Sequence, residues 1–108
     1  KALLYDFYGE LLTSHQREIY EDIVLNDYSI SEVAQELGIS RQGVHDQVRR
    51  VDKLLAGYEE RLMLVKKFLD LKEKVSSIRK IVDNCNLENL DAVKNAVAEI
   101  SDSILEEL

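Results

Sequence analysis

A group of polar and basic side chains between residues 40 and 53 has the residue types and spacing of a nucleic-acid contact surface. If this segment is a helix, its polar side chains lie opposite an apolar face formed by Val44, Val48, Val51 and Leu55. Such polar side chains bind base edges and phosphate oxygens in DNA complexes. The candidate DNA-binding residues are Ser40, Arg41, Gln42, His45, Asp46, Arg49, Arg50 and Lys53.

These candidates differ in the part of DNA that each can contact. Gln42 has the amide group that pairs with an adenine edge, and Arg49 has the guanidinium that pairs with guanine. Asp46 can accept a hydrogen bond from cytosine, but its carboxylate repels phosphate. For each residue the alternative is a solvated helix surface without DNA contacts. The candidates for phosphate binding are Ser40, Arg41, Arg50 and Lys53.

Two short helices and a tight turn, within residues 29–50, are expected to position these side chains. Ser29 stands three residues before a Glu, the spacing of a capping box at a helix start. Gly38 suits the left-handed conformation that ends a helix. Ala34 is small enough for two crossing helices to approach, and Val44 packs the second helix onto the first. This pattern predicts a helix-turn-helix.

The rest of the chain also has a helical period, with no Pro and only four Gly. We predict an all-α fold: a helix-turn-helix domain over residues 1–57, then a long helical hairpin over residues 58–108. The fourth helix is expected to end near Ala56, and the hairpin loop falls around residues 84–86. Heptad-like apolar spacing in the hairpin predicts self-association as a homodimer, with an intramolecular bundle as the alternative.

Composition excludes several classes of protein. One Cys excludes a disulfide scaffold, and no apolar run is long enough to span a membrane. No basic segment followed by an apolar run opens the chain, so we expect a cytoplasmic protein without membrane insertion. His15, His45 and Cys85 lie on separate expected elements, and the carboxylates have no His partners at metal-binding spacing. We therefore expect no catalytic site, no metal site and no cofactor.

The net charge of −7 is unevenly distributed. Residues 1–28 hold two cations and six anions, and residues 83–108 hold one cation and seven anions. Residues 29–57 hold four of each, whereas residues 58–82 hold seven cations and four anions. The helix-turn-helix is therefore neutral, and DNA binding is expected to be weak unless a partner covers the acidic ends.

Several short motifs resemble known families. Leu12-Thr13-Ser14, together with the 29–50 segment, resembles region 4 of bacterial sigma factors, whose helix-turn-helix reads the promoter −35 element. Tyr5-Asp6-Phe7-Tyr8, Asp27-Tyr28-Ser29 and the Gly38–Asp46 string are similar to the YlxM-type family, encoded beside the signal recognition particle GTPase in Gram-positive bacteria. The chain departs from the sigma pattern at Gly43, where sigma-like proteins usually carry Thr.

The resemblance implies a sigma-region-4-like helix-turn-helix protein with a regulatory role tied to the signal recognition particle pathway. Two hypotheses follow. In the first, the chain is a DNA-binding regulatory protein that contacts double-stranded DNA. In the second, it is a protein-interaction module of the secretion machinery, binding signal recognition particle components and no specific DNA.

Overall fold

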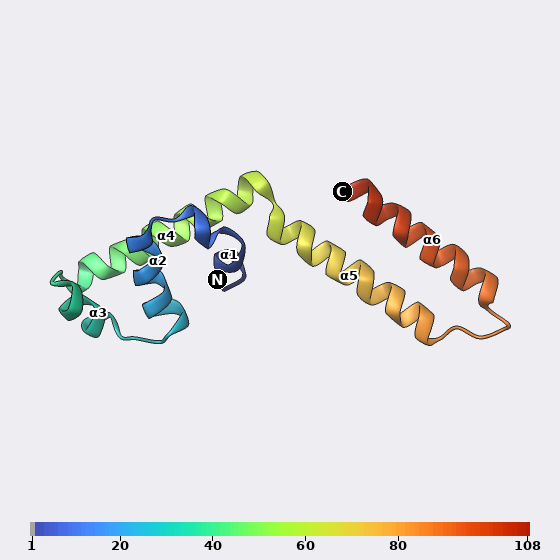
Figure 1. The fold of residues 1–108 in the computed structure, drawn as a ribbon, viewed down its shortest axis with the longest axis horizontal. Helices are drawn as coiled ribbons and strands as arrows, with labels where there is room; N and C mark the ends of the chain where they lie inside the picture. Colours follow the sequence, from blue (N-terminus) through green and yellow to red (C-terminus); the bar gives the residue numbers. More distant parts are fainter. Residues whose placement is uncertain (1) are drawn as a thin grey trace. The chain divides into compact units, whose positions relative to one another are not determined.

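The computed structural model describes residues 2–108, and every regular element in that range is a helix. The predicted all-α class is therefore confirmed. In chain order the elements are α1 (Ala2–Tyr8), the 3-10 helix η1 (Gly9–Leu11), α2 (Ser14–Tyr20), the π-helix η2 (Glu21–Leu25), α3 (Ile30–Leu37), α4 (Arg41–Leu62), α5 (Leu64–Asp83) and α6 (Leu90–Glu107) (Figure 1). The chain forms two compact units, which divide between Val65 and Lys66.

The helix-turn-helix of the first unit is present, but of the capping box predicted at Ser29 and Glu32 only the Ser29 half forms. Ser29 caps α3 by accepting a hydrogen bond from the Glu32 amide at 3.1 Å. Gly38 ends that helix in the left-handed conformation, with φ of 69°. A complete capping box lies instead at the start of α2, where the side chains of Thr13 and Gln16 each accept from the other residue's amide.

Two apolar clusters hold the first unit together. One joins the helices of the motif and contains Ile19, Val33, Ala34 and Val44, so the predicted contact between the motif's helices is present. The other packs the N-terminal helices against the middle of α4 and contains Tyr8, Leu12, Tyr20, Val51 and Leu55. The apolar face predicted for α4 is thus buried, with Val48 half-buried between the two clusters.

Buried tyrosines tie this second cluster to carboxylates. The Tyr20 hydroxyl donates to Asp52 of α4 at 2.7 Å, and the Tyr20 ring stacks on Tyr5 with centroids 5.4 Å apart. Tyr5 in turn donates to Glu21 of η2. Burial is the main cause that raises the pKa of Tyr20, and the Asp52 carboxylate raises it further. The phenol therefore stays protonated and remains a hydrogen-bond donor at neutral pH.

Helix α4 runs past the expected end near Ala56 and stops at Met63. Met63 adopts the left-handed conformation, with φ of 56°. The Tyr8 hydroxyl accepts a hydrogen bond from the Leu64 amide at 3.0 Å and donates one to Glu59 Oε1 at 2.5 Å. Glu59 Oε1 also accepts a hydrogen bond from the Val65 amide at 2.9 Å. These side chains satisfy the first free amides of α5, so the helix boundary falls here.

Because Met63 has a positive φ, two substitutions at this residue should differ in their effect on stability. Both Met63→Gly and Met63→Ala remove the side chain, but only Gly adopts positive φ without a Cβ clash. We expect Met63→Gly to be more stable than Met63→Ala by about 1 kcal/mol in urea unfolding. At exposed Ala56, inside α4, Ala56→Gly should instead destabilise by a similar amount. Equal or greater stability of Met63→Ala would contradict this account.

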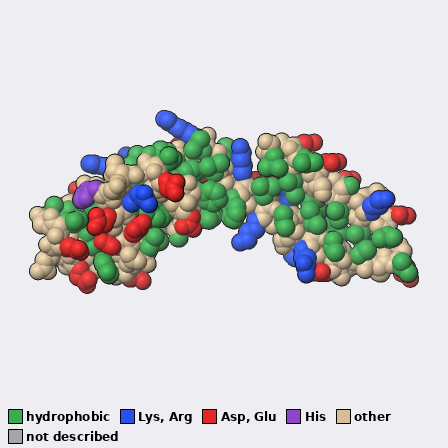
Figure 2. Space-filling model, in the orientation of Figure 1, with side chains coloured by type: hydrophobic (Ala, Val, Ile, Leu, Met, Phe, Trp, Pro, Cys, Tyr) green, Lys and Arg blue, Asp and Glu red, His purple; other side chains and the backbone are tan. Residues whose placement is uncertain are grey.

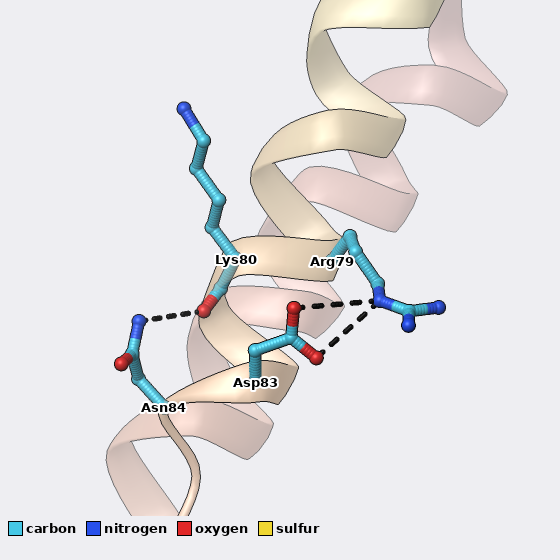
Figure 3. Close-up of polar contacts among 4 residues, drawn as sticks. All are labelled: Arg79, Lys80, Asp83 and Asn84. Carbon is cyan, nitrogen blue, oxygen red and sulfur yellow. Dashed lines mark hydrogen bonds and ion pairs between the residues drawn. The ribbon is translucent and has the colours of Figure 1, made fainter.

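The second unit is the predicted helical hairpin. Lys74 of α5 forms an ion pair with Glu107 of α6, and the two helices run antiparallel (Figure 1). At the end of α5, Arg79 pairs with Asp83 at 3.3 Å, and the Asn84 side chain donates to the Lys80 carbonyl at 2.9 Å (Figure 3). Every residue from Lys66 to Leu108 is described, and none of their side chains is buried.

The loop between these helices is held by asparagine side chains. Asn86 and Asn89 each accept a hydrogen bond from the other's amide, at 2.7 and 2.9 Å, and the Asn89 side chain donates to the Asn84 carbonyl at 3.0 Å. Cys85 lies exposed in this loop. Among residues 2–108, no helix combines the length and the apolar character needed to cross a bilayer.

Candidate nucleic-acid interface

The first turns of α4 present the candidate residues to solvent. The Ser40 hydroxyl caps the helix by accepting from the Gly43 amide at 2.9 Å, which fixes where the helix begins. Val44 packs against α3 and anchors the opposite face. All the candidates are exposed, so the structure presents one continuous polar surface made of Ser40, Arg41, Gln42, His45, Asp46, Arg49, Arg50 and Lys53.

Two shallow depressions divide this surface into parts. The first lies at the motif's turn and is lined by Ile30 of α3 together with Arg41, Gln42 and His45 of α4. The second lies further along α4 and is lined by Asp46, Arg49, Arg50, Asp52 and Lys53. The structure thus brings the candidate base-reading residues and the candidate phosphate-binding residues onto one side of a single helix.

Asp46 makes a hydrogen bond on α4 that was not predicted from the sequence. Its Oδ1 accepts a hydrogen bond from Gln42 Nε2 at 3.0 Å. The two residues are four apart, and side chains at that spacing face each other on a helix, so the sequence does contain the signal. The carboxylate orients the Gln42 amide, whose oxygen and second N–H stay available to a base edge.

Half-buried Asp52 lines the second depression beside the candidate arginines Arg49 and Arg50. It also accepts the hydrogen bond from buried Tyr20, so it links the surface to the core. Figure 2 shows acidic side chains gathered at the end of the first unit that holds α2 and α3, with basic side chains along α4. Apart from exposed Arg17 of α2, the cations described in the first unit lie on α4, and anionic ligands meet repulsion from the acidic side chains beside them.

Gly43 occupies the position where the sequence departs from the sigma pattern. A Cβ added to Gly43 would lie 3.2 Å from Ser40 Oγ and 3.7 Å from Ile39 Cδ1. The Ser40 hydroxyl already accepts the Gly43 amide hydrogen at that place. The same kind of cap forms over residues with side chains at Ser29–Glu32 and Thr13–Gln16, so the cap alone does not require Gly at this position.

The residues considered for catalysis lie on separate elements of the chain. His15 is exposed on α2, His45 is exposed on α4, and Cys85 is exposed in the hairpin loop. Among residues 2–108, no group of His, Cys, Asp and Glu side chains is arranged to hold a metal ion.

Known proteins resemble this chain over nearly its whole length. A family model described as "Putative helix-turn-helix protein, YlxM / p13 like" matches residues 1–100. A UPF0122 protein of Acetivibrio thermocellus is 39% identical over 107 residues, 99% of this chain and 92% of the relative. A relative from Caldanaerobacter subterraneus subsp. tengcongensis is 51% identical over 81 residues, 75% of this chain and 69% of its own length. The UPF0122 protein YlxM of Bacillus subtilis (strain 168) is 39% identical over 85 residues, 79% of this chain and 77% of the relative.

Proposed function

This chain belongs to the YlxM / p13-like helix-turn-helix family, and we propose that it is a regulatory protein that binds double-stranded DNA through the first turns of α4. One observation carries this proposal. Every polar candidate from Ser40 to Lys53 is exposed on a helix whose opposite face is packed and whose start is capped. A rigid helix that presents amide and guanidinium groups to solvent is what major-groove recognition requires.

The proposed contacts assign different roles along α4. Gln42 and Arg49 read base edges, and His45 lies between them on the same exposed surface. Phosphate is bound by the Ser40 hydroxyl and by Arg41, Arg50 and Lys53. Because the strip is short and lies beside acidic helices, we expect modest affinity that decreases steeply with salt.

The test is a fluorescence anisotropy titration of the full chain with random-sequence duplex DNA at several salt concentrations. Each neutralised phosphate contributes a slope of about −0.9 to the plot of log K against log salt. With the proposed phosphate contacts we expect a slope of about −2 to −4 per chain. Binding that does not respond to salt, or no binding at low salt, would contradict the proposal.

Asp46 provides a second test because it lowers the positive charge of the surface. Asp46→Asn removes the charge but keeps an oxygen that can accept the hydrogen bond from Gln42. We expect it to strengthen duplex binding by about two- to fivefold, since one close repulsion near phosphate is worth roughly 0.5–1 kcal/mol. The control is Asp91→Asn on exposed α6, which should leave affinity unchanged. Weaker binding by Asp46→Asn would show that the carboxylate itself contacts DNA.

We further propose that this activity belongs to the signal recognition particle pathway, in the cytoplasm, and that the working form is a homodimer. The pathway follows from the resemblance to YlxM-type proteins. The acidic α2–α3 end favours a second candidate function, a protein-interaction module of the secretion machinery that binds no specific DNA (Figure 2). Retention of the signal recognition particle GTPase or its RNA on the immobilised chain, without duplex binding, would favour that candidate.

A further inference from the structure

Gln42 and Asp46 form a hydrogen-bonded pair at the start of α4. Gln42 is the second residue of this helix, and Asp46 follows it about one turn later. Gln42 Nε2 donates to Asp46 Oδ1 at 3.0 Å, and both side chains are exposed. In helix-turn-helix proteins the side chains that contact base edges lie in these first turns of the second helix. The pair therefore lies where the proposed function places a contact with a base.

The carboxylate of Asp46 decides which end of the Gln42 amide faces it. An ionised carboxylate accepts hydrogen bonds and donates none, so only the Nε2 end of the amide can pair with it. The Gln side chain has two N–H donors on Nε2 and an oxygen acceptor. Since Asp46 takes one N–H, Gln42 keeps one N–H donor and its oxygen acceptor for a base edge.

These remaining groups match one base edge of the major groove. Adenine presents one acceptor, N7, beside one donor, the N6 amino group. Guanine presents two neighbouring acceptors, N7 and O6, and so requires two donors. Gln42 held by Asp46 can therefore make two hydrogen bonds to adenine but leaves one guanine acceptor unpaired, and the carboxylate repels that acceptor. An amide released from Asp46 could turn both N–H groups toward guanine.

The depression beside Gln42 leaves room for a base edge. The described residues that line it, none of them acidic, are Ile30, Arg41, Gln42 and His45. Asp46 instead lines the second depression. A base edge that enters the first depression thus meets the Gln42 amide without meeting a carboxylate in the lining.

The hydrogen bond between the two side chains should strengthen when DNA covers it. In the free protein it is exposed, and a pair at this spacing contributes little to stability. An interface that excludes water strengthens a hydrogen bond to a charged group. Turning the amide toward guanine would then leave the carboxylate in the interface without its donor, which is costly.

We infer that Asp46 is a positioning residue that makes Gln42 selective for adenine over guanine, an inference that rests on the proposed function because it concerns the base that the same surface contacts. Asp46 lowers the overall affinity for DNA through its charge. In return it gives the protein a preference for an A·T pair at one position of the duplex.

The test is selection of duplexes from a library of randomised double-stranded DNA by the full chain, followed by sequencing. The position that Gln42 contacts is the one whose base preference is lost in Gln42→Ala. There we expect the native chain to favour adenine over guanine at least about fivefold, since a bidentate contact gives discrimination of this order or more. Asp46→Asn should bring the ratio below about twofold, because the Asn amide can accept from Gln42 or donate to it and no longer fixes its orientation.

Two controls separate this role from a simple effect of charge. Glu60→Gln removes one exposed carboxylate from the same helix and should leave the ratio unchanged. In the Gln42→Ala background, Asp46→Asn should strengthen binding without changing any base preference, because Asp46 acts through Gln42.

Several results would overturn the inference while leaving the proposed function in place. They are a base preference that Gln42→Ala does not alter, a preference for guanine, an adenine preference that persists in Asp46→Asn, and a cytosine preference that disappears in Asp46→Asn. The last of these would show that Asp46 contacts a base directly. Absence of duplex binding by the native chain would instead overturn the proposed function, and the inference with it.

Discussion

Replacement of Tyr20 with Ala is expected to lower the free energy of unfolding by about 3–5 kcal/mol. The Tyr20 side chain is fully buried and packs with Val51 and Leu55 of α4. Its ring also stacks on Tyr5, and its hydroxyl donates to Asp52. The substitution removes this packing, leaves a cavity and deprives Asp52 of a donor, and all of these effects destabilise the folded chain.

The measurement is urea unfolding followed by far-ultraviolet circular dichroism. Tyr28→Ala is the matched control, because Tyr28 is 47% exposed and lies outside both apolar clusters. It should change the free energy of unfolding by less than about 0.5 kcal/mol. A Tyr20→Phe variant separates the hydroxyl from the ring, and we expect it to cost only about 1–3 kcal/mol. If Tyr20→Ala were as stable as the control, the buried contact between the N-terminal helices and α4 would be wrong.

Removal of both Arg49 and Arg50 is expected to weaken duplex binding by tenfold or more while leaving the fold intact. Both side chains are exposed, so their loss creates no cavity. A guanidinium that reads a base edge contributes about 1–3 kcal/mol, and one that binds phosphate also contributes to the salt slope. Arg49→Ala should therefore reduce sequence preference, whereas Arg50→Ala should make the salt slope less negative by about 1.

The double variant needs a control with the same change in net charge. Lys72→Ala with Lys80→Ala removes two exposed cations from α5 of the second unit. If binding depended only on net charge, both double variants would weaken it equally. The proposed interface instead requires that the Arg49 and Arg50 variant be clearly weaker than the lysine variant, and equal affinities would contradict it.

The sequence predicted the features whose cause is local. Ser29 and Gly38 set the start and end of α3 through contacts within a few residues, and the 100° step placed Val44 on the buried face. The exposure of all the candidate residues followed from the same periodicity. These elements need no knowledge of distant residues.

Features that depend on distant residues were not predictable in this way. Helix α4 continues past Gly57 because Tyr58 packs on the core, and it ends where Tyr8 and Glu59, 51 residues apart, accept the first amides of α5. The π-helical segment Glu21–Leu25 also gave no local signal. The domain division between residues 57 and 58 stays a prediction, although α4 runs through that boundary.

Binding of duplex DNA by the polar surface of α4 is measured by titrating the full chain with random-sequence duplex across a series of salt concentrations. We expect saturable binding at low salt, with an association constant that decreases linearly with salt on logarithmic axes at a slope of about −2 to −4 per chain. We also expect the Arg49→Ala, Arg50→Ala variant to lose most of this binding. No saturable binding at low salt, or binding by the variant equal to that of the native chain, would contradict the proposed interface.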